Sequence, residues 1–150
     1  MYASGKGVRQ DYVQAIEWYR KAAEQGDMVA QLNVGVMYAN GQGVEQDYVQ
    51  AVKWYRKAAE QGNAKAQFNL GVVYATGQGD RQDYVQAAQW YHKAAEQGLA
   101  DAQYNLGEMY YHGRGVRQSH NLAKEWFGKA CQNGLQQGCE AYRHLDGTEF

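Results

Sequence analysis

A segment of 36 residues recurs along the chain, and this repetition is the strongest constraint on the fold. The first two copies begin at Gly5 and Gly41 and share most residues: GKGVRQDYVQAIEWYRKAAEQG in the first becomes GQGVEQDYVQAVKWYRKAAEQG in the second. A third copy begins at Gly77, and a divergent fourth begins at Gly113. We therefore predict a single domain over 1–150 with repeats at 5–40, 41–76, 77–112 and 113–146. Residues 1–4 match the end of a repeat and are interpreted as the remnant of a preceding helix.

Each copy predicts two helices, here called helix A and helix B. In the first copy, helix A is expected to begin after an N-cap at Asp11 and to end before Gly26, and the equivalent residues stand at 47 and 62 and at 83 and 98. Helix B is expected from about Met28 to Tyr38. Because a pair of antiparallel helices cannot bury both of its apolar faces alone, successive pairs must stack. The prediction is an all-α protein, an α-solenoid.

Recurring large and small residues indicate how the pairs pack. We predict that the aromatic residues on the packing face of helix A form the core between repeats: Trp18, Trp54, Trp90 and Trp126, with Tyr12, Tyr48 and Tyr84. A glycine also recurs inside helix B, at Gly35, Gly71 and Gly107. A glycine within a helix costs about 1 kcal/mol relative to alanine. We therefore expect a neighbour too close for a methyl group there, namely the Ala22 and Ala23 surface.

Composition excludes several classes of partner. Lysine and arginine total 15 against 16 aspartates and glutamates, which gives a net charge of −1 and no overall attraction to nucleic acid or anionic lipid. No apolar run approaches the roughly 20 residues of a membrane-spanning helix. We expect a soluble protein with no nucleic-acid partner and no membrane insertion.

Motifs for catalysis are also missing from the sequence. Neither of its two serines, Ser4 and Ser119, lies in a GxSxG or SxxK motif, and the four histidines are scattered. The GxG of each connector follows no predicted strand and lacks the third glycine of a dinucleotide-binding loop. We predict no catalytic residue, no cofactor and no metal site.

The pattern AxxxLGxxYxxGxGVxxDxxxAxxWYxKAAEQG can be followed from Ala66 to Gly98, with Asp80 in place of the usual valine. This pattern resembles the Sel1-like repeat, which is related to the tetratricopeptide repeat, over about residues 1–140. The resemblance implies a right-handed superhelix of antiparallel helix pairs that holds other proteins, commonly as an adaptor.

Both cysteines of the chain lie in the fourth copy. In the repeat frame, Cys131 falls at the position of Ala23, near the end of helix A, and Cys139 falls at that of Gln31, in the first turns of helix B. A tight turn at Gly134 brings the two positions toward each other, and the same spacing occurs in the cysteine-rich branch of the family. We favour a disulfide, with two buried thiols, a metal site or a catalytic cysteine as alternatives. A disulfide favours a periplasmic or secreted location, and thiols favour the cytoplasm.

Comparison of the copies indicates where a partner binds. Helix A carries positions that vary between copies or expose methyl groups, and in this family helix A is expected to line the concave surface. The predicted partner-binding residues are Val13, Ile16, Glu17, Arg20, Val49, Val52, Lys53, Arg56, Val85, Gln89, His92 and Glu125. The alternative is that these surface positions simply drift. The predicted function is a non-catalytic scaffold that binds a protein or peptide in this groove.

Two other functions stay open. The unprotected first hairpin predicts a possible homodimer, and the cysteine-rich relatives raise β-lactam binding as a further alternative. Variable positions on helix B are expected to be solvated: Val29, Val36, Lys65, Asp101 and Glu108. In the fourth copy, charged residues at packing positions predict a solvated cap: Glu140, Arg143 and Asp146.

Overall fold

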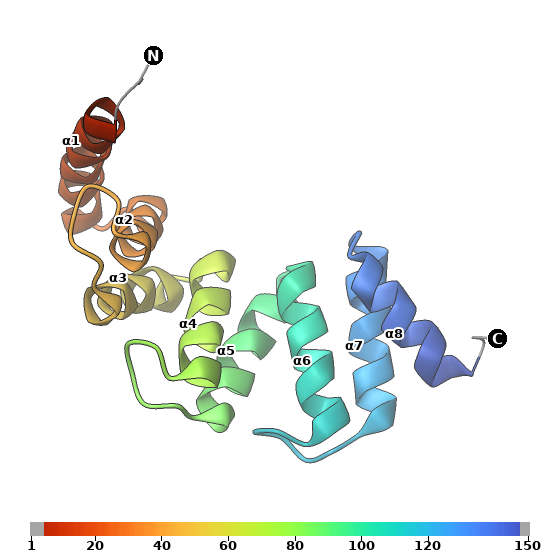
Figure 1. The fold of residues 1–150 in the computed structure, drawn as a ribbon. Helices are drawn as coiled ribbons and strands as arrows, with labels where there is room; N and C mark the ends of the chain where they lie inside the picture. Colours follow the sequence, from red (N-terminus) through yellow and green to blue (C-terminus); the bar gives the residue numbers. More distant parts are fainter. Residues whose placement is uncertain (1–4, 148–150) are drawn as a thin grey trace.

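The protein is an array of α-helices that follow one another along a curved line. The computed structural model describes residues 5–147, with side chains from residue 10 onward, and this part contains eight helices and no strand. The helices are α1 Gly5–Glu24, α2 Met28–Asn40, α3 Tyr48–Glu60, α4 Ala64–Thr76, α5 Tyr84–Glu96, α6 Ala100–His112, α7 His120–Gln132 and α8 Gln136–Asp146. Figure 1 shows α1 and α8 at opposite ends of the array. Odd-numbered helices are the predicted A helices, and even-numbered helices are the predicted B helices.

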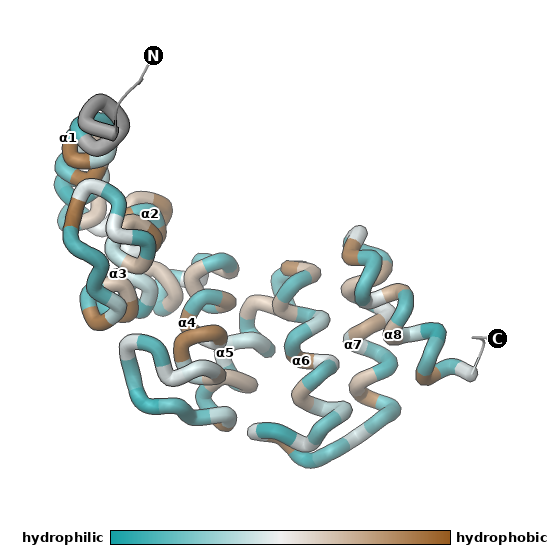
Figure 2. Tube along the Cα trace, in the orientation of Figure 1, coloured by the Kyte–Doolittle hydropathy of each residue, from teal (hydrophilic) through white to brown (hydrophobic). Residues whose placement is uncertain are grey.

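Each helix packs against its neighbours in chain order, which confirms the predicted α-solenoid. Every B helix from α2 to α6 makes more extensive contact with the A helix that follows it than with the A helix that precedes it. The core therefore lies as much between repeats as within them. Figure 2 shows hydrophilic and hydrophobic stretches alternating along the chain, and none of the described helices is long and apolar enough to cross a membrane.

The predicted N-caps are correct in the second and third copies and wrong in the first. Asp47 and Asp83 accept hydrogen bonds from the backbone N–H groups three residues later, as N-caps do. Asp11 instead lies inside α1, which begins at Gly5. In the second copy the connector is held because the Asp47 N–H donates to the Tyr38 carbonyl at 2.9 Å. The equivalent carbonyl in the first copy belongs to residues 1–4, which lie outside the described residues together with the predicted helix remnant.

The glycines inside the B helices make room for an aromatic ring from the next repeat. A Cβ atom added at Gly71 would lie 2.5 Å from two carbon atoms of the Tyr91 ring. Tyr55 and Phe127 crowd Gly35 and Gly107 in the same way. Close packing at these glycines was therefore predicted correctly, but the predicted neighbour, the alanine surface of helix A, was wrong. The aromatic ring can approach the B helix this closely only because glycine has no Cβ atom.

Three of the four tryptophans are buried as predicted, and Trp18 is not. Trp54 is 8% exposed and packs in a cluster with Ala23, Ala30 and Val34 of the preceding repeat. Trp90 and Trp126 are equally buried. Trp18 is 73% exposed, because no preceding repeat lies against it among the described residues. A tryptophan of helix A is therefore buried by the preceding hairpin. The two helices of its own hairpin are not enough to bury it.

The predicted core position of the tyrosines at the start of helix A was wrong. Tyr12, Tyr48 and Tyr84 are all exposed. Tyr48 and Tyr84 are the first residues of α3 and α5, and the side chain of Gln46 donates a hydrogen bond to the Tyr48 hydroxyl at 3.1 Å at the surface. These rings lie at the edge of the helix layer instead of within it.

Buried glutamines tie successive repeats together. The Gln31 side chain donates to the Ala23 carbonyl at 3.1 Å and accepts a hydrogen bond from Gln61 of the next repeat at 2.7 Å. The same arrangement recurs one repeat later, where Gln67 accepts from Gln97 at 2.9 Å. Because each buried amide has partners on both sides, burying it incurs little desolvation penalty and sets the register between repeats.

Candidate functional site

A hollow of about 560 Å³ lies beside α3 and gathers four of the predicted partner-binding residues. We call it the α3 hollow. Its lining residues are Val49, Val52, Lys53, Arg56, Lys57, Glu60, Gly79 and Asp80. The first six come from successive turns of α3, and the last two come from the connector that leads to α5. Helix A of the second repeat thus forms one wall of the hollow, and the following connector forms another.

The connector approaches α3 closely at Gly79. This glycine has a φ of +95°, and a Cβ atom added to it would lie 2.6 Å from the Tyr48 carbonyl oxygen and 2.7 Å from Val52 Cγ2. Glycine is required both for the left-handed backbone and for the close contact. The connector thereby covers Val52, which is only 6% exposed.

Two predicted partner-binding residues are therefore not on the surface. Val52 is buried, and Ile16, its equivalent in the first repeat, is 4% exposed. The prediction that these two side chains supply an apolar surface to a partner was wrong. The reason is that the connector of the next repeat packs over helix A. The helical spacing of Val52 with Tyr55 and Ala59, which are also buried, agrees with its place on the packing face of helix A.

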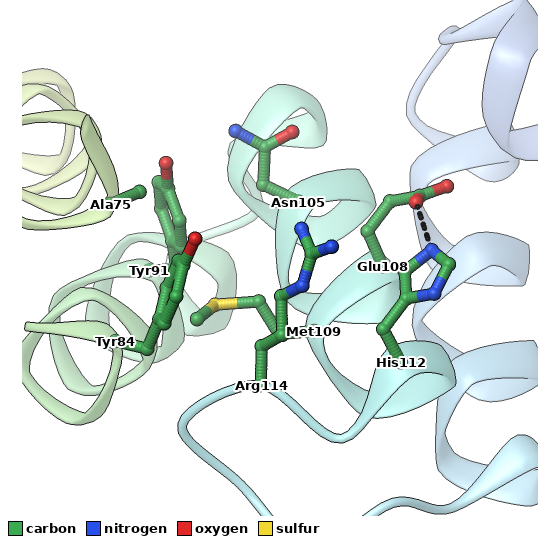
Figure 3. Close-up of a pocket in the computed structure, with 8 residues that line it drawn as sticks. All are labelled: Ala75, Tyr84, Tyr91, Asn105, Glu108, Met109, His112 and Arg114. Carbon is green, nitrogen blue, oxygen red and sulfur yellow. Dashed lines mark hydrogen bonds and ion pairs between the residues drawn. The ribbon is translucent and has the colours of Figure 1, made fainter.

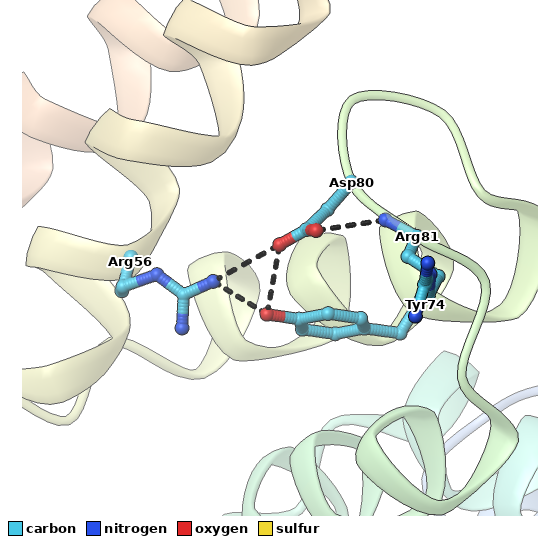
Figure 4. A network of polar contacts seen from close by, with 4 residues as sticks. All are labelled: Arg56, Tyr74, Asp80 and Arg81. Atoms are coloured by element: carbon cyan, nitrogen blue, oxygen red, sulfur yellow. Dashed lines mark hydrogen bonds and ion pairs between the residues drawn. The ribbon is translucent and has the colours of Figure 1, made fainter.

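Arg56 belongs to a polar network that joins two helices and the connector (Figure 4). Its guanidinium donates to the Tyr74 hydroxyl on α4 and lies 3.5 Å from an Asp80 carboxylate oxygen. The Tyr74 hydroxyl donates to Asp80 at 3.3 Å, and the Arg81 backbone N–H donates to the same carboxylate at 2.7 Å. Both charged side chains stay about two fifths exposed, so the ion pair itself contributes less than about 1 kcal/mol.

The network assigns Arg56 a positioning role that its variability between copies did not indicate. Arg20, the equivalent residue in the first repeat, likewise donates to a tyrosine hydroxyl, that of Tyr38. Asp80 stands where the repeat pattern has valine, and it exchanges an apolar contact for polar ones. This departure from the repeat was the one sequence signal that could have placed the connector in the site.

Other predicted residues are exposed and available to a partner. Val49 is 66% exposed, and Val13 and Val85 are exposed at the equivalent positions. The side chains of four polar predicted residues are also exposed: Glu17, Lys53, Gln89 and Glu125. Val49 and Lys53 lie one helical turn apart, so they face the same side of α3.

His92 lies in a different hollow, between α5 and α7. This hollow has a volume of about 490 Å³ and includes Trp126 and Lys129. The His92 Nδ1 atom lies 3.0 Å from a Glu96 carboxylate oxygen, and its ring meets the edge of the Trp126 ring at a centroid distance of 5.6 Å. The predicted groove residues therefore do not share one hollow.

Lys57 and Glu60 also line the α3 hollow and were missed. Lys57 is a lysine in all four repeats, and its ammonium group lies 4.9 Å from the Trp54 ring centroid. Comparison of the copies ignored it because it does not vary. A residue that the scaffold itself requires can still line a binding surface.

Three tyrosines on α3, α5 and α6 have raised pKa values. Burial raises the pKa of Tyr55 to about 12 and also raises those of Tyr91 and Tyr104. A buried phenol therefore stays protonated to a higher pH than an exposed one. Within residues 5–147 no cluster of side chains could hold a metal ion. Ser119 serves as the N-cap of α7 and accepts a hydrogen bond from the Leu122 N–H at 3.1 Å.

The two cysteines form the predicted disulfide. Cys131 and Cys139 are bonded with their Cα atoms 4.5 Å apart. In the earlier repeats the same two positions are linked by a hydrogen bond from the glutamine side chain to the alanine carbonyl. The fourth hairpin thus replaces a hydrogen bond across its two helices with a covalent bond.

The charged cap of the fourth repeat is exposed as predicted. Glu140, Arg143 and Asp146 all lie at the surface, and Asp146 forms an ion pair with Lys124 of α7. The acidic group raises the pKa of Lys124 through their hydrogen bond.

The repeat pattern and the helix stacking agree with a known family. The Sel1 repeat family model matches four successive segments of the chain, residues 1–27, 29–63, 64–99 and 100–135. The chain belongs to the Sel1 repeat family. The family segments pair a B helix with the A helix that follows it, which is also the more extensive contact in the array. Sel1 repeat proteins are generally non-catalytic scaffolds for protein interaction.

Solved structures of this family resemble the chain closely. One is a protective antigen of uropathogenic Escherichia coli with an SLR fold: it has 43% identity and a TM-score of 0.87 over 91% of the chain, which covers 30% of that protein. A Sel1 repeat protein from Oxalobacter formigenes has 39% identity and a TM-score of 0.79, with 84% of the chain and 95% of that protein covered.

Helicobacter pylori cysteine rich protein B has 31% identity and a TM-score of 0.71, and the alignment covers 91% of the chain and 98% of that protein. This similarity agrees with the cysteine pair of the fourth repeat. A search of curated proteins found no match.

Proposed function

We propose that this Sel1 repeat protein is a scaffold that binds a segment of another protein in the α3 hollow. The observation that carries the proposal is the exposed pair Val49 and Lys53, which projects from a rigid repeat beside a hollow large enough for several side chains. The general role of the family as a scaffold for protein interaction supports it.

The charges of the α3 hollow suggest the chemistry of the segment. Lys53, Arg56 and Lys57 face Glu60 and Asp80, and two of the three cations already have partners in the protein. Arg56 pairs with Asp80, and Lys57 lies over the Trp54 ring. Lys53 has no ion pair among the described residues. We therefore expect a partner with an apolar side chain for Val49 and an acidic one for Lys53.

A selected peptide tests this proposal. A peptide is selected from a random displayed library against the intact chain, and its affinity is measured by calorimetry. We expect the double variant Val49→Asp/Lys53→Glu to weaken binding by about tenfold or more. Its melting temperature should stay unchanged, because both side chains are exposed.

The matched control is Val29→Asp/Lys65→Glu, which makes the same exchanges at exposed positions of two B helices. It should bind the peptide as the wild type does. Equal losses in the two double variants, or no loss at the α3 hollow, would reject this surface.

Self-association through the first hairpin is a second candidate, and the exposure of Trp18 favours it. A head-to-tail contact with α8 is disfavoured, because Arg143 occupies the position where the other B helices need glycine to admit an aromatic ring. The pairing would therefore join two α1 faces. Light scattering should then detect a dimer that Trp18→Ser converts to a monomer, and a monomeric wild type would exclude it.

The disulfide supports function in an oxidising compartment, such as a periplasm or the cell exterior.

A further inference from the structure

A hollow on the helix B side of the array combines an apolar floor with a cation at its rim (Figure 3). It has a volume of about 180 Å³, and we call it the Arg114 hollow. Ala75, Tyr91 and Met109 supply apolar atoms, and Tyr84, Asn105 and Arg114 supply polar groups. These residues come from α4, α5, α6 and the connector after α6. None of them lines the α3 hollow, so the two surfaces are separate.

Arg114 is held at the rim without a carboxylate partner. Its guanidinium lies over the Tyr84 ring, 5.8 Å from the centroid, and it forms no ion pair with any described residue. Stacking on a ring holds the planar group but leaves its N–H donors free for a carboxylate. In Figure 3 the guanidinium stands between Tyr84 and Glu108.

The carboxylate in the same hollow, that of Glu108, already contacts a histidine. A Glu108 carboxylate oxygen lies 3.3 Å from His112 Nε2, one helical turn along α6, as the dashed line in Figure 3 shows. Burial raises the pKa of the Tyr91 hydroxyl, and the nearby Asn105 side chain partly offsets this rise. Arg114 therefore lines this hollow with N–H donors that form no ion pair, while the Glu108 carboxylate already contacts His112.

The preceding repeat contains a matched hollow without the cation. It has a volume of about 290 Å³ and keeps Tyr48, Tyr55 and Asn69 at the positions of Tyr84, Tyr91 and Asn105. Gln78 takes the place of Arg114. Val72 and Thr76 take the places of Glu108 and His112. We call it the Gln78 hollow. The chain thus contains two equivalent hollows, one with an arginine and the other with a glutamine at the same repeat position.

We propose that the Arg114 hollow binds an acidic-aliphatic segment of a partner protein, in which an aliphatic side chain is followed by an aspartate or glutamate. The aliphatic side chain would fill the floor over Met109, and the volume suits one such group. The neighbouring carboxylate would receive two N–H bonds from Arg114, the geometry that guanidinium and carboxylate groups favour. This site is additional to the α3 hollow, and it makes the helix B side a second recognition surface.

Two blocked peptides test the proposal on the intact chain. The probes are acetyl-Gly-Leu-Glu-Gly-amide and its glutamine analogue, which carry no terminal charge and differ only in the acid. Binding at millimolar concentration is followed by the NMR amide shifts of the isotope-labelled protein. The glutamate peptide should shift Asn105 and Arg114 and should bind about fivefold or more tightly than the glutamine peptide.

Two substitutions then exchange the chemistry of the hollows. Arg114→Gln should abolish the preference for glutamate that the Asn105 shift reports, and Gln78→Arg should create a further glutamate-dependent site reported by Asn69. Lys53→Glu, in the α3 hollow, should change neither result, which separates this proposal from the proposed function. Equal binding of the two peptides, no shift with either, or a preference that survives Arg114→Gln would overturn the proposal.

Discussion

Replacing Gly71 by alanine tests how closely successive repeats pack. Gly71 lies inside α4, and a Cβ atom added there would lie 2.5 Å from the Tyr91 ring of the next repeat. This is about 1 Å short of an ordinary carbon–carbon contact. The ring cannot retreat easily, because Tyr91 is itself buried.

The magnitude follows from two opposing terms. Alanine stabilises a helix by about 1 kcal/mol relative to glycine. Forcing an extra carbon into a packed core costs about 1–3 kcal/mol, and the rigid ring places this site in the upper part of that range. We expect Gly71→Ala to lower the free energy of unfolding by about 1–2 kcal/mol.

Gly128→Ala is the matched control within the same protein. Gly128 also lies inside a helix, α7, but a Cβ atom there would lie 3.1 Å from the ring of Tyr142, which is only partly buried and can shift. At this site the gain in helix propensity from glycine to alanine should exceed the cost of the extra carbon atom. Gly128→Ala should be neutral or stabilising by up to about 1 kcal/mol.

Urea unfolding followed by far-ultraviolet circular dichroism measures both variants. The reasoning also predicts coupling: in a Tyr91→Ala background the ring is gone, and Gly71→Ala should become neutral or stabilising. A stabilising Gly71→Ala in the wild type, or the same loss with and without the ring, would refute the proposed contact.

Three further outcomes test the disulfide, the buried tyrosine and the tryptophans. Reduction of the Cys131–Cys139 bond, which spans eight residues, should lower the free energy of unfolding by about 2–3 kcal/mol, and melts with and without reductant measure this. The pKa of Tyr55 is raised to about 12, so the folded state favours the protonated form, and stability should fall by about 2–3 kcal/mol as pH rises from about 10 to 12. In pH-dependent urea unfolding, Tyr55→Phe should lose about 2–3 kcal/mol less than the wild type over this range, because Tyr91 and Tyr104 still titrate with raised pKa values. Trp54→Ala should cost about 3–5 kcal/mol, and Trp18→Ala less than about 1 kcal/mol; equal losses in denaturation would contradict the packing described.

The candidate site was predictable from sequence in part. Val49 and Lys53 are exposed as expected, because they occupy helix A positions outside the packing stripe. Val52 and Ile16 were misplaced, because the residues that cover helix A belong to a connector far along the chain. The Arg114 hollow was not predicted at all, since its walls come from three helices and a connector.

The repeat by itself determined the helices, their order and the stacking, and it favoured the cysteine pair without excluding free thiols. Each of these depends on local periodicity or on comparison between copies, and both are written in the chain. Only the tertiary structure decided that Tyr91 fills the space at Gly71, that Trp18 is exposed while Trp54 is buried, and that Asp80 joins Arg56 to α4. These outcomes depend on which neighbour covers a residue, and identical side chains in identical helices have different surroundings when that neighbour is missing or changed.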